Sequence, residues 1–216
     1  YPPSEHTVAS VKADIYQDIR KLEYASGSVD EIRNHHIFEH FPRVDAIRLL
    51  LQWREWLKAD GLLIIETPDF RASAKAYVFA LTQKRRMELG RHIFGSQEAN
   101  WAYHYDFWDK DKFIFVLKKL GFKDIRIKRF KNSAAKRYQK IPFLNFFGNL
   151  IPNSVYFKYG GNKYPDIVVS ARKNGEIDID SDQITRDILS QYLSLHDGDK
   201  MMNAWMNSNN RDWNEK

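Results

Sequence analysis

One stretch, residues 27–70, constrains the fold more than any other part of the sequence. It reads GSVDEIRNHHIFEHFPRVDAIRLLLQWREWLKADGLLIIETPDF, with the short apolar runs SVDEI and LLIIE on either side of a longer amphipathic segment. Two strands joined through a helix are typical of the right-handed parallel crossover in an open α/β sheet. We therefore predict, in this order, a strand, a His-rich turn, a long helix, a tight turn and a second strand.

The helix is predicted to begin at Pro42, because the missing N–H of proline has no helical partner in the first turn. Asp60-Gly61 supplies the left-handed turn that ends it, and the run 62–65 is long enough for a buried central strand. In sheets of this kind a ligand binds beyond the carboxyl ends of the strands. Those ends carry the polar groups Asn34-His35-His36 and Thr67-Pro68-Asp69.

The sequence on both sides of this stretch predicts further elements. Val11, Ala13 and Ile15 recur at the period-two spacing of a strand. The stretch 92–113 alternates between aromatic and polar residues without clean periodicity, which favours a lid or substrate loop over a core element. The other predicted elements are a helix over 72–87, a helix over 113–120, a strand over 122–130, a strand over 167–173 and a helix over 184–193.

Composition excludes several classes of protein. The chain has 216 residues, of which 43% are hydrophobic and 14% aromatic, so it is not a disordered polypeptide. It contains no apolar run near the roughly 18 residues that a membrane helix needs, and its start lacks a signal-peptide pattern. The absence of cysteine excludes disulfides and a cysteine nucleophile. A cytoplasmic enzyme without a membrane partner is therefore expected.

The net charge of +6 is distributed unevenly along the chain. Eight bases and one acid lie within 123–140, whereas 176–182 holds four acids and no base. A basic segment beside a site can hold an anionic substrate such as a phosphorylated sugar, or nucleic acid. More often such a segment is a solvated surface, so nucleic acid is not the expected partner.

Four sequence marks together suggest a family. They are DIRKLEYASGSVDEI (18–32), HHIFEHF (35–41), LKADGLLIIETPDF (57–70), and YHYDFW (103–108) ahead of an LKKLGF helix end. In this order and at these spacings, residues from about 10 to 173 resemble the class I S-adenosylmethionine-dependent methyltransferases, in particular the group called methyltransferase type 11. The resemblance implies a Rossmann-like α/β sheet, mostly parallel with an antiparallel last strand, and S-adenosylmethionine as cofactor.

The sequence departs from this family at its start. No glycine precedes Gly27, so the family's glycine-rich loop after the first strand is absent, as is its ribose-binding acidic residue. We therefore expect the first strands of the family's sheet to be missing from this chain. For the cofactor, the resemblance implies that Asp18 and Ile19 bind the adenine, and Asn34 and His35 complete the predicted binding set. The alternative for Asp18 is a solvated carboxylate in a turn.

Histidines are the leading candidates for catalysis. Methyl transfer from a sulfonium has a good leaving group, so the protein must chiefly bring acceptor and methyl together. A hydroxyl acceptor also benefits from a base, and imidazole titrates near neutral pH. His104 is the favoured base; the alternative is that it packs as an ordinary aromatic ring. The further candidates are His35, His36 and His40, with Asp69 as a carboxylate that orients the acceptor.

Metal binding is the rival use of these histidines. His35, His36 and His40 with Glu39 carry suitable ligand atoms. Adjacent residues at a strand end rarely point the same way, however, so no metal is predicted.

Two domains or segments are predicted. Residues 1–173 form the methyltransferase-like domain, with an insertion over 132–164 whose apolar IPFLNFFGNLIP caps the acceptor site or forms a contact in a homo-oligomer. Residues 174–216 form an acidic linker, a helix with the capping pair Asp180 and Gln183, and an irregular tail.

The predicted function is methylation of a small molecule from S-adenosylmethionine. The resemblance favours O-methylation of a sugar or a related intermediate of polysaccharide biosynthesis, with an anionic sugar as one such acceptor. One alternative is RNA or protein methylation, which only the basic segment favours. The other alternative is a degenerate domain that serves assembly without catalysis, which the missing glycine-rich loop favours.

Overall fold

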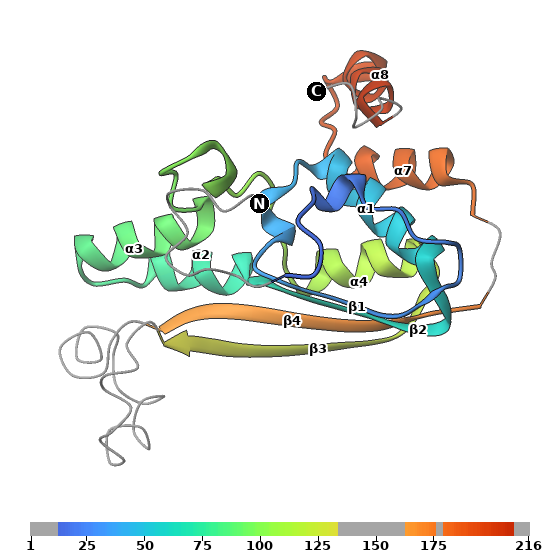
Figure 1. Ribbon diagram of the computed structural model, residues 1–216. Helices are drawn as coiled ribbons and strands as arrows, with labels where there is room; N and C mark the ends of the chain where they lie inside the picture. Colours follow the sequence, from blue (N-terminus) through green and yellow to red (C-terminus); the bar gives the residue numbers. More distant parts are fainter. Residues whose placement is uncertain (1–12, 134–162, 176–178, 210–216) are drawn as a thin grey trace.

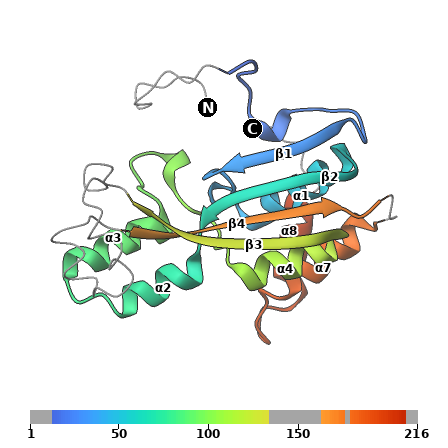
Figure 2. The same cartoon turned by 90° about the horizontal axis from the view of Figure 1, so that it is seen from below.

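A four-stranded sheet forms one layer of the molecule and helices form the other (Figure 1). The computed structural model describes residues 13–133, 163–175 and 179–209. The helices α1, α4, α7 and α8 lie above the sheet in Figure 1, and the face seen from below in Figure 2 carries no helix of the described residues. The strands are β1 (Val29–His35), β2 (Leu57–Pro68), β3 (Phe122–Ser133) and β4 (Lys163–Lys173).

The sheet has the strand order β1-β2-β4-β3. Strands β1 and β2 pair in parallel, whereas β4 pairs antiparallel with both β2 and β3. Three strands thus run in one direction, and the last strand of the chain runs against them. This confirms the predicted α/β sheet, mostly parallel with an antiparallel last strand.

The predicted crossover is present as β1, helix α1 (Arg43–Trp56) and β2. Pro42 stands immediately before α1, as its preference for helix starts predicts. The helix ends earlier than predicted, because β2 already begins at Leu57, and the turn at Asp60-Gly61 is a local distortion inside this strand. Asp60 has φ 61°, and a Cβ on Gly61 would lie 2.8 Å from the carbonyl oxygen of Lys58. Glycine is therefore required at position 61.

The hydrophobic core lies between the sheet and the helices. Alternate residues of β2 and β4 face this core in register, Leu63 opposite Ala171 and Ile65 opposite Val169, and all four are at most 1% exposed. Helix α4 (Lys110–Lys119) adds the fully buried Phe113. Burial of a Leu, Ile or Phe side chain stabilises the fold by about 1.5–3 kcal/mol. Alternation along the strands therefore decides which strand residues face the helices.

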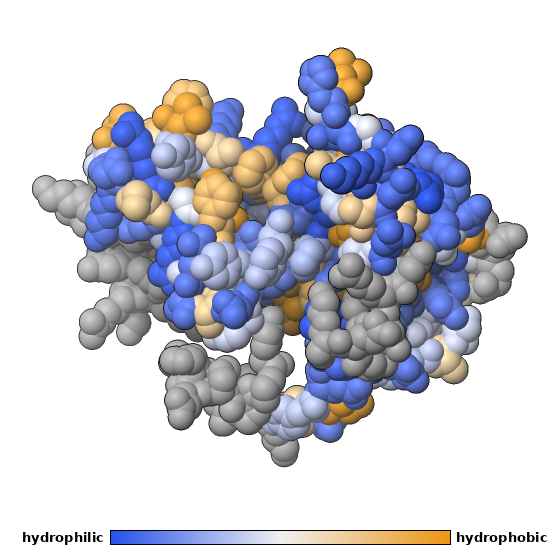
Figure 3. Space-filling model, turned by 90° about the horizontal axis from the view of Figure 1, so that it is seen from above, coloured by the Kyte–Doolittle hydropathy of each residue, from blue (hydrophilic) through white to orange (hydrophobic). Residues whose placement is uncertain are grey.

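The single helix predicted over 72–87 is wrong. The structure has two helices there, α2 (Phe70–Val78) and α3 (Gln83–Phe94). Thr82 begins the second one, since its side chain accepts a hydrogen bond from the backbone N–H of Arg85. Apolar side chains reach the surface over these helices, on the left of Figure 3. They include Val78, Phe79, Leu81 and Met87, each at least 66% exposed.

The C-terminal helices belong to the same core. Helix α7 (Ser181–Ser190) begins as predicted, with Asp180 accepting a hydrogen bond from the N–H of Gln183. Helix α8 (Gly198–Asn209) stands where an irregular tail was expected. Its Met202 and Met206 join the core cluster that the sheet and the other helices form. The predicted boundary between two segments at residue 173 stays a prediction. None of the described helices is both long and apolar enough to cross a membrane.

Two other expectations are wrong. Residues 13–16 form no strand, and Ile15 and Tyr16 are each 58% exposed. The alternating pattern gives no strand here because no described strand pairs with these residues. Val11 lies outside the described residues. The stretch 92–113 is only partly a surface loop. Its Trp108 is 2% exposed and lies with its ring centroid 4.7 Å from that of Phe38. Residues 134–162 of the predicted insertion also lie outside the described residues.

A buried ion pair fixes the second half of the 92–113 stretch. Lys112 donates to Asp106 over 2.6 Å and lies 3.9 Å from the centroid of the Trp108 ring. The hydroxyl of Tyr192, beyond α7, donates to the same carboxylate over 3.3 Å. Burial lowers the pKa of Lys112 to about 8, although the Asp106 carboxylate opposes this shift. The cluster therefore links this stretch to the C-terminal helices.

Candidate functional site

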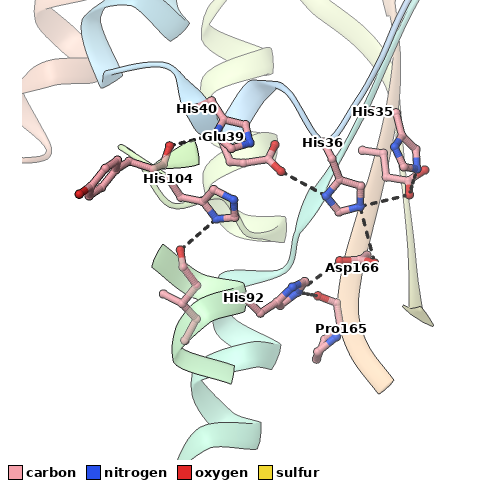
Figure 4. Close-up of polar contacts among 11 residues, drawn as sticks. His35, His36, Glu39, His40, His92, His104, Pro165 and Asp166 are labelled. Carbon is pink, nitrogen blue, oxygen red and sulfur yellow. Dashed lines mark hydrogen bonds and ion pairs between the residues drawn. The ribbon is translucent and has the colours of Figure 1, made fainter. Parts of the chain in front are cut away.

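Histidines and carboxylates from five parts of the chain converge beyond the carboxyl ends of β1 and β2 (Figure 4). Three short 3-10 helices occur in the described chain: η1 (Ile19–Lys21), η2 (Phe38–His40) and η3 (Asn100–Ala102). The second supplies Glu39 and His40, and this placement matches the rule that ligands bind at strand ends. A cavity of about 440 Å³ opens among these groups and is lined in part by His36, Glu39, His40, His92, His104 and Tyr164.

His36 turns the chain from β1 into η2. It has φ 50°, a left-handed conformation that few residues other than glycine adopt. Its Nδ1 lies 3.1 Å from a carboxylate oxygen of Glu39, and its Nε2 lies 3.6 Å from Glu66 and 3.8 Å from Asp166. Burial lowers the pKa of His36, but the bond to Glu39 and the neighbouring carboxylates outweigh it and raise the pKa above 6.5.

Glu39 is the buried carboxylate of the cavity, with only 3% exposure. One oxygen binds His36, and the other, Oε2, makes no hydrogen bond within the part of the chain that the structure describes. Burial raises the pKa of Glu39, yet the hydrogen bond from His36 and the nearby imidazoles lower it overall. Glu39 is therefore an anion whose second oxygen is free to bind a proton donor or a cation.

His40 and His104 are held in one tautomer by the backbone. The Nδ1 of His40 donates to the carbonyl oxygen of Tyr103 over 2.9 Å, and that of His104 donates to Ile93 over 3.2 Å. A carbonyl only accepts, so Nδ1 carries a proton in both rings, and in the neutral form of each ring the lone pair is on Nε2. The ring centroids are 4.7 Å apart. Burial lowers the pKa of His104, which keeps this ring neutral at pH 7.

His92 lines the other side of the cavity and Asp166 lies behind it, in contact with His36 and His92; sequence reasoning missed both residues. His92 Nε2 lies 3.3 Å from Asp166 and 3.1 Å from the carbonyl oxygen of Pro165. Asp166 is 1% exposed, which is rare for a carboxylate without a charged or polar neighbour. The one sequence signal was for Asp166, which stands within β4 directly before the apolar residues 167–169; His92 carried no such signal.

The predicted catalytic residues divide into two groups. His36, His40 and His104 lie together on the cavity. His35 lies on the other face of the sheet, 63% exposed and 2.7 Å from Glu66, because successive strand residues alternate between faces.

Asp69 is fully buried and does not line the cavity. It begins α2 by accepting from the N–H of Ala72 over 3.1 Å, and it accepts from Arg129 over 2.6 Å. These contacts account for Asp69 structurally, and its catalytic role stays a prediction.

The predicted cofactor residues lie outside this cavity. Asp18 begins η1 and forms a 2.6 Å ion pair with Arg20, and Ile19 follows in the same turn. Asn34 is 5% exposed on the helix-covered face of β1, and neither polar atom of its amide makes a hydrogen bond within the described residues. A buried amide without partners is costly, so Asn34 fits a position that contacts a ligand or water.

The basic segment is partly neutralised where the structure describes it. Lys123 pairs with Asp60 over 2.7 Å, and Arg129 pairs with Asp69. Lys136, Arg137 and Lys140 lie outside the described residues.

Comparisons with known proteins leave the family open and identify likenesses among solved structures. No model of a protein family matches the sequence, and no curated protein matches it. Two similar structures are S-adenosylmethionine-dependent methyltransferases from Methanosarcina mazei and Archaeoglobus fulgidus. They are 13% and 15% identical with TM-scores of 0.43 and 0.41, and each alignment covers 74% of this chain.

Another similar structure is phosphoethanolamine N-methyltransferase 2 from Haemonchus contortus in complex with phosphomonomethylethanolamine and S-adenosylhomocysteine. It is 14% identical with a TM-score of 0.40, and the alignment covers 72% of this chain and 36% of that one. The chain spans 66% of each of the two archaeal proteins, just under two thirds of their length. The class named in these comparisons is the class that the sequence resembles.

Proposed function

We propose that this chain is a methyltransferase domain that uses S-adenosylmethionine to methylate a hydroxyl group of a small molecule in the cytoplasm. The observation that supports this best is the pair of imidazoles, His40 and His104, beside the buried carboxylate of Glu39 at the carboxyl ends of two parallel strands. A cavity of about 440 Å³ is within the size range of small-molecule sites. We assign the base to this cavity and not to His35.

The residues fit the cofactor in part. Asn34, with an unpartnered buried amide at the end of β1, is placed to hold the cofactor, and Asp18 and Ile19 offer a carboxylate and a backbone amide to the adenine. The carboxylate of Asp18 retains lone pairs beyond those that bind Arg20. The described residues include no glycine-rich loop between a strand and a helix. When bound, the cofactor supplies an electrophilic methyl group on a sulfonium.

The protein's own part in the reaction is to position the acceptor and to accept its proton. His104 is neutral and has a lone pair on Nε2, so this atom takes the hydroxyl proton as the methyl group is transferred. The carboxylate of Glu39 stabilises the imidazolium that forms. The neighbouring aromatic side chain of Trp101 lines the same cavity and limits access of water.

A sugar-like acceptor suits the lining of the cavity. Trp101 and Tyr164 offer aromatic surfaces, Glu88 offers an acceptor of hydroxyl hydrogen bonds, and Arg91 offers a cation for an anionic substituent. We infer that the acceptor is a sugar or a related intermediate of polysaccharide biosynthesis. The exposed apolar side chains at the junction of α2 and α3 support a contact between copies of the chain.

Calorimetric titration tests the cofactor assignment. The full chain is expected to give saturable heat with S-adenosylmethionine and S-adenosylhomocysteine. Asp18→Ala should weaken the binding of both ligands by about 10- to 150-fold, because a hydrogen bond to a charged group contributes about 1.5–3 kcal/mol. Asp14→Ala, an exposed neighbour, is the matched control and should bind like the wild type. Folded wild-type protein that gives no heat with either ligand would contradict the proposal.

A further inference from the structure

Glu39, His40 and His104 lie close enough together to bind one metal ion between them. The ligand atoms that they offer all lie within 4.8 Å of one another. In a tetrahedral site with bonds of about 2.0–2.2 Å, neighbouring ligand atoms are roughly 3.3–3.6 Å apart. A movement of about an ångström by flexible side chains therefore closes the set around one ion. Figure 4 shows the two rings and the carboxylate side by side at the cavity.

The hydrogen bonds around these histidines are those of metal ligands. Metal-binding histidines usually donate their second ring N–H to a carboxylate or a backbone carbonyl, which fixes the tautomer and the ring orientation. His40 and His104 both do this through Nδ1, to Tyr103 and Ile93. In the neutral form of each ring, Nε2 therefore carries a lone pair that can bind a metal ion. The two histidines are 64 residues apart in the chain.

Glu39 supplies the negative charge that such a site needs. Its Oε1 is held by His36, and its Oε2 is buried without a hydrogen-bond partner in the described ranges. A buried carboxylate oxygen without a donor costs free energy that a cation would offset. The second nearby set, His35, His36 and Glu66, lacks this feature because His35 is 63% exposed and already paired with Glu66.

We propose that Glu39, His40 and His104 bind one divalent transition-metal ion, with Zn²⁺ as the representative. Two imidazoles and one carboxylate suit Zn²⁺, Fe²⁺ or Co²⁺ better than Mg²⁺ or Ca²⁺, which prefer oxygen ligands. Three protein ligands leave a coordination position open toward the cavity. The proposal does not rest on methyl transfer. Ion binding and proton acceptance use the same lone pair of His104, so the metal-bound protein does not use His104 as its base.

Metal titration of the tag-free, chelator-treated full chain tests this site. Calorimetry with Zn²⁺ should show one ion per chain, and Co²⁺ should give the visible absorption bands of a low-coordinate complex. Glu39→Gln and His40→Gln should each weaken Zn²⁺ binding by at least about 10-fold, since loss of an outer-shell partner alone costs 10–100-fold. His35→Gln, from the neighbouring set, is the matched control and should bind Zn²⁺ like the wild type.

A second measurement does not depend on any variant. X-ray absorption of the Zn²⁺-loaded wild type should show two imidazole ligands with oxygen completing the shell. Folded wild-type protein that neither takes up Zn²⁺ nor gives Co²⁺ bands would overturn the proposal. A His35→Gln variant that loses as much affinity as Glu39→Gln would also overturn it, by placing the ion at the other set.

Discussion

His104→Gln is expected to abolish most methyl transfer while leaving the protein folded. In the neutral ring Nδ1 donates to the carbonyl of Ile93, so the lone pair is on Nε2, and this atom is the base that glutamine cannot replace. Loss of a general base costs about 10²–10⁴-fold in rate. The glutamine amide can still donate to the carbonyl of Ile93, so the thermal midpoint and the affinity for S-adenosylhomocysteine should stay near those of the wild type.

His196→Gln is the matched control for this experiment, because His196 is exposed beyond α7 and does not line the cavity. It should retain the wild-type rate. If His104→Gln unfolds several degrees early with normal turnover per folded molecule, His104 is a packing residue. The base would then be His36 or His40, which lie on the same cavity.

Asp106→Asn is expected to destabilise the protein by about 3–5 kcal/mol, because it leaves the buried ammonium of Lys112 without its counter-ion. The side chains of the pair are 1% and 10% exposed, and the Asp106 carboxylate also accepts from Tyr192. For a chain of this size the midpoint should fall by roughly 6–20 °C. Differential scanning calorimetry at pH 7 measures the shift.

The pH dependence of this loss identifies its cause. Lys112 has a pKa of about 8 in the folded protein, and removal of Asp106 lowers it further. Between the two values the variant binds fewer protons than the wild type when folded, so its stability rises more steeply with pH. The difference in the free energy of unfolding between the wild type and Asp106→Asn should therefore narrow as pH rises to about 8 and change little above it. Asp111→Asn, whose partner Arg71 is 68% exposed, is the matched control and should shift the midpoint little.

The crossover from β1 through α1 to β2 was predictable because periodicity and turn chemistry are local signals, whereas the antiparallel last strand was expected from the family resemblance alone. The apolar runs of β1 and β2 and the proline before α1 each mark one step of the crossover, whereas the glycine at position 61 lies inside β2 and does not end the helix. The break between α2 and α3 was not predictable in the same way. Phe79 and Leu81 continue an apolar pattern through the break but are at least 67% exposed, so hydrophobic spacing gave the wrong boundary there.

The site was predictable only where a short local segment determines the positions of its residues. The motif HHIFEHF placed His36, Glu39 and His40 at a strand end, where one short segment determines their positions. β1 extends to His35, so alternation along the strand turns this ring to the other face of the sheet. The motif itself does not show where the strand ends, and the orientation of His35 was therefore not predictable from it. His92 and Asp166 meet only because α3 and β4 are brought together by the whole fold, so local sequence gave no sign of their contact.

A crystal structure of the full chain with S-adenosylhomocysteine tests the central claim most directly. We predict that the adenine lies beside Asp18 and Ile19, that Asn34 binds the ligand through its amide, and that the sulfur faces the cavity lined by Glu39, His40 and His104. A well-ordered protein that takes up no S-adenosylhomocysteine at millimolar concentration, or that binds it with the sulfur turned away from these residues, would contradict the account.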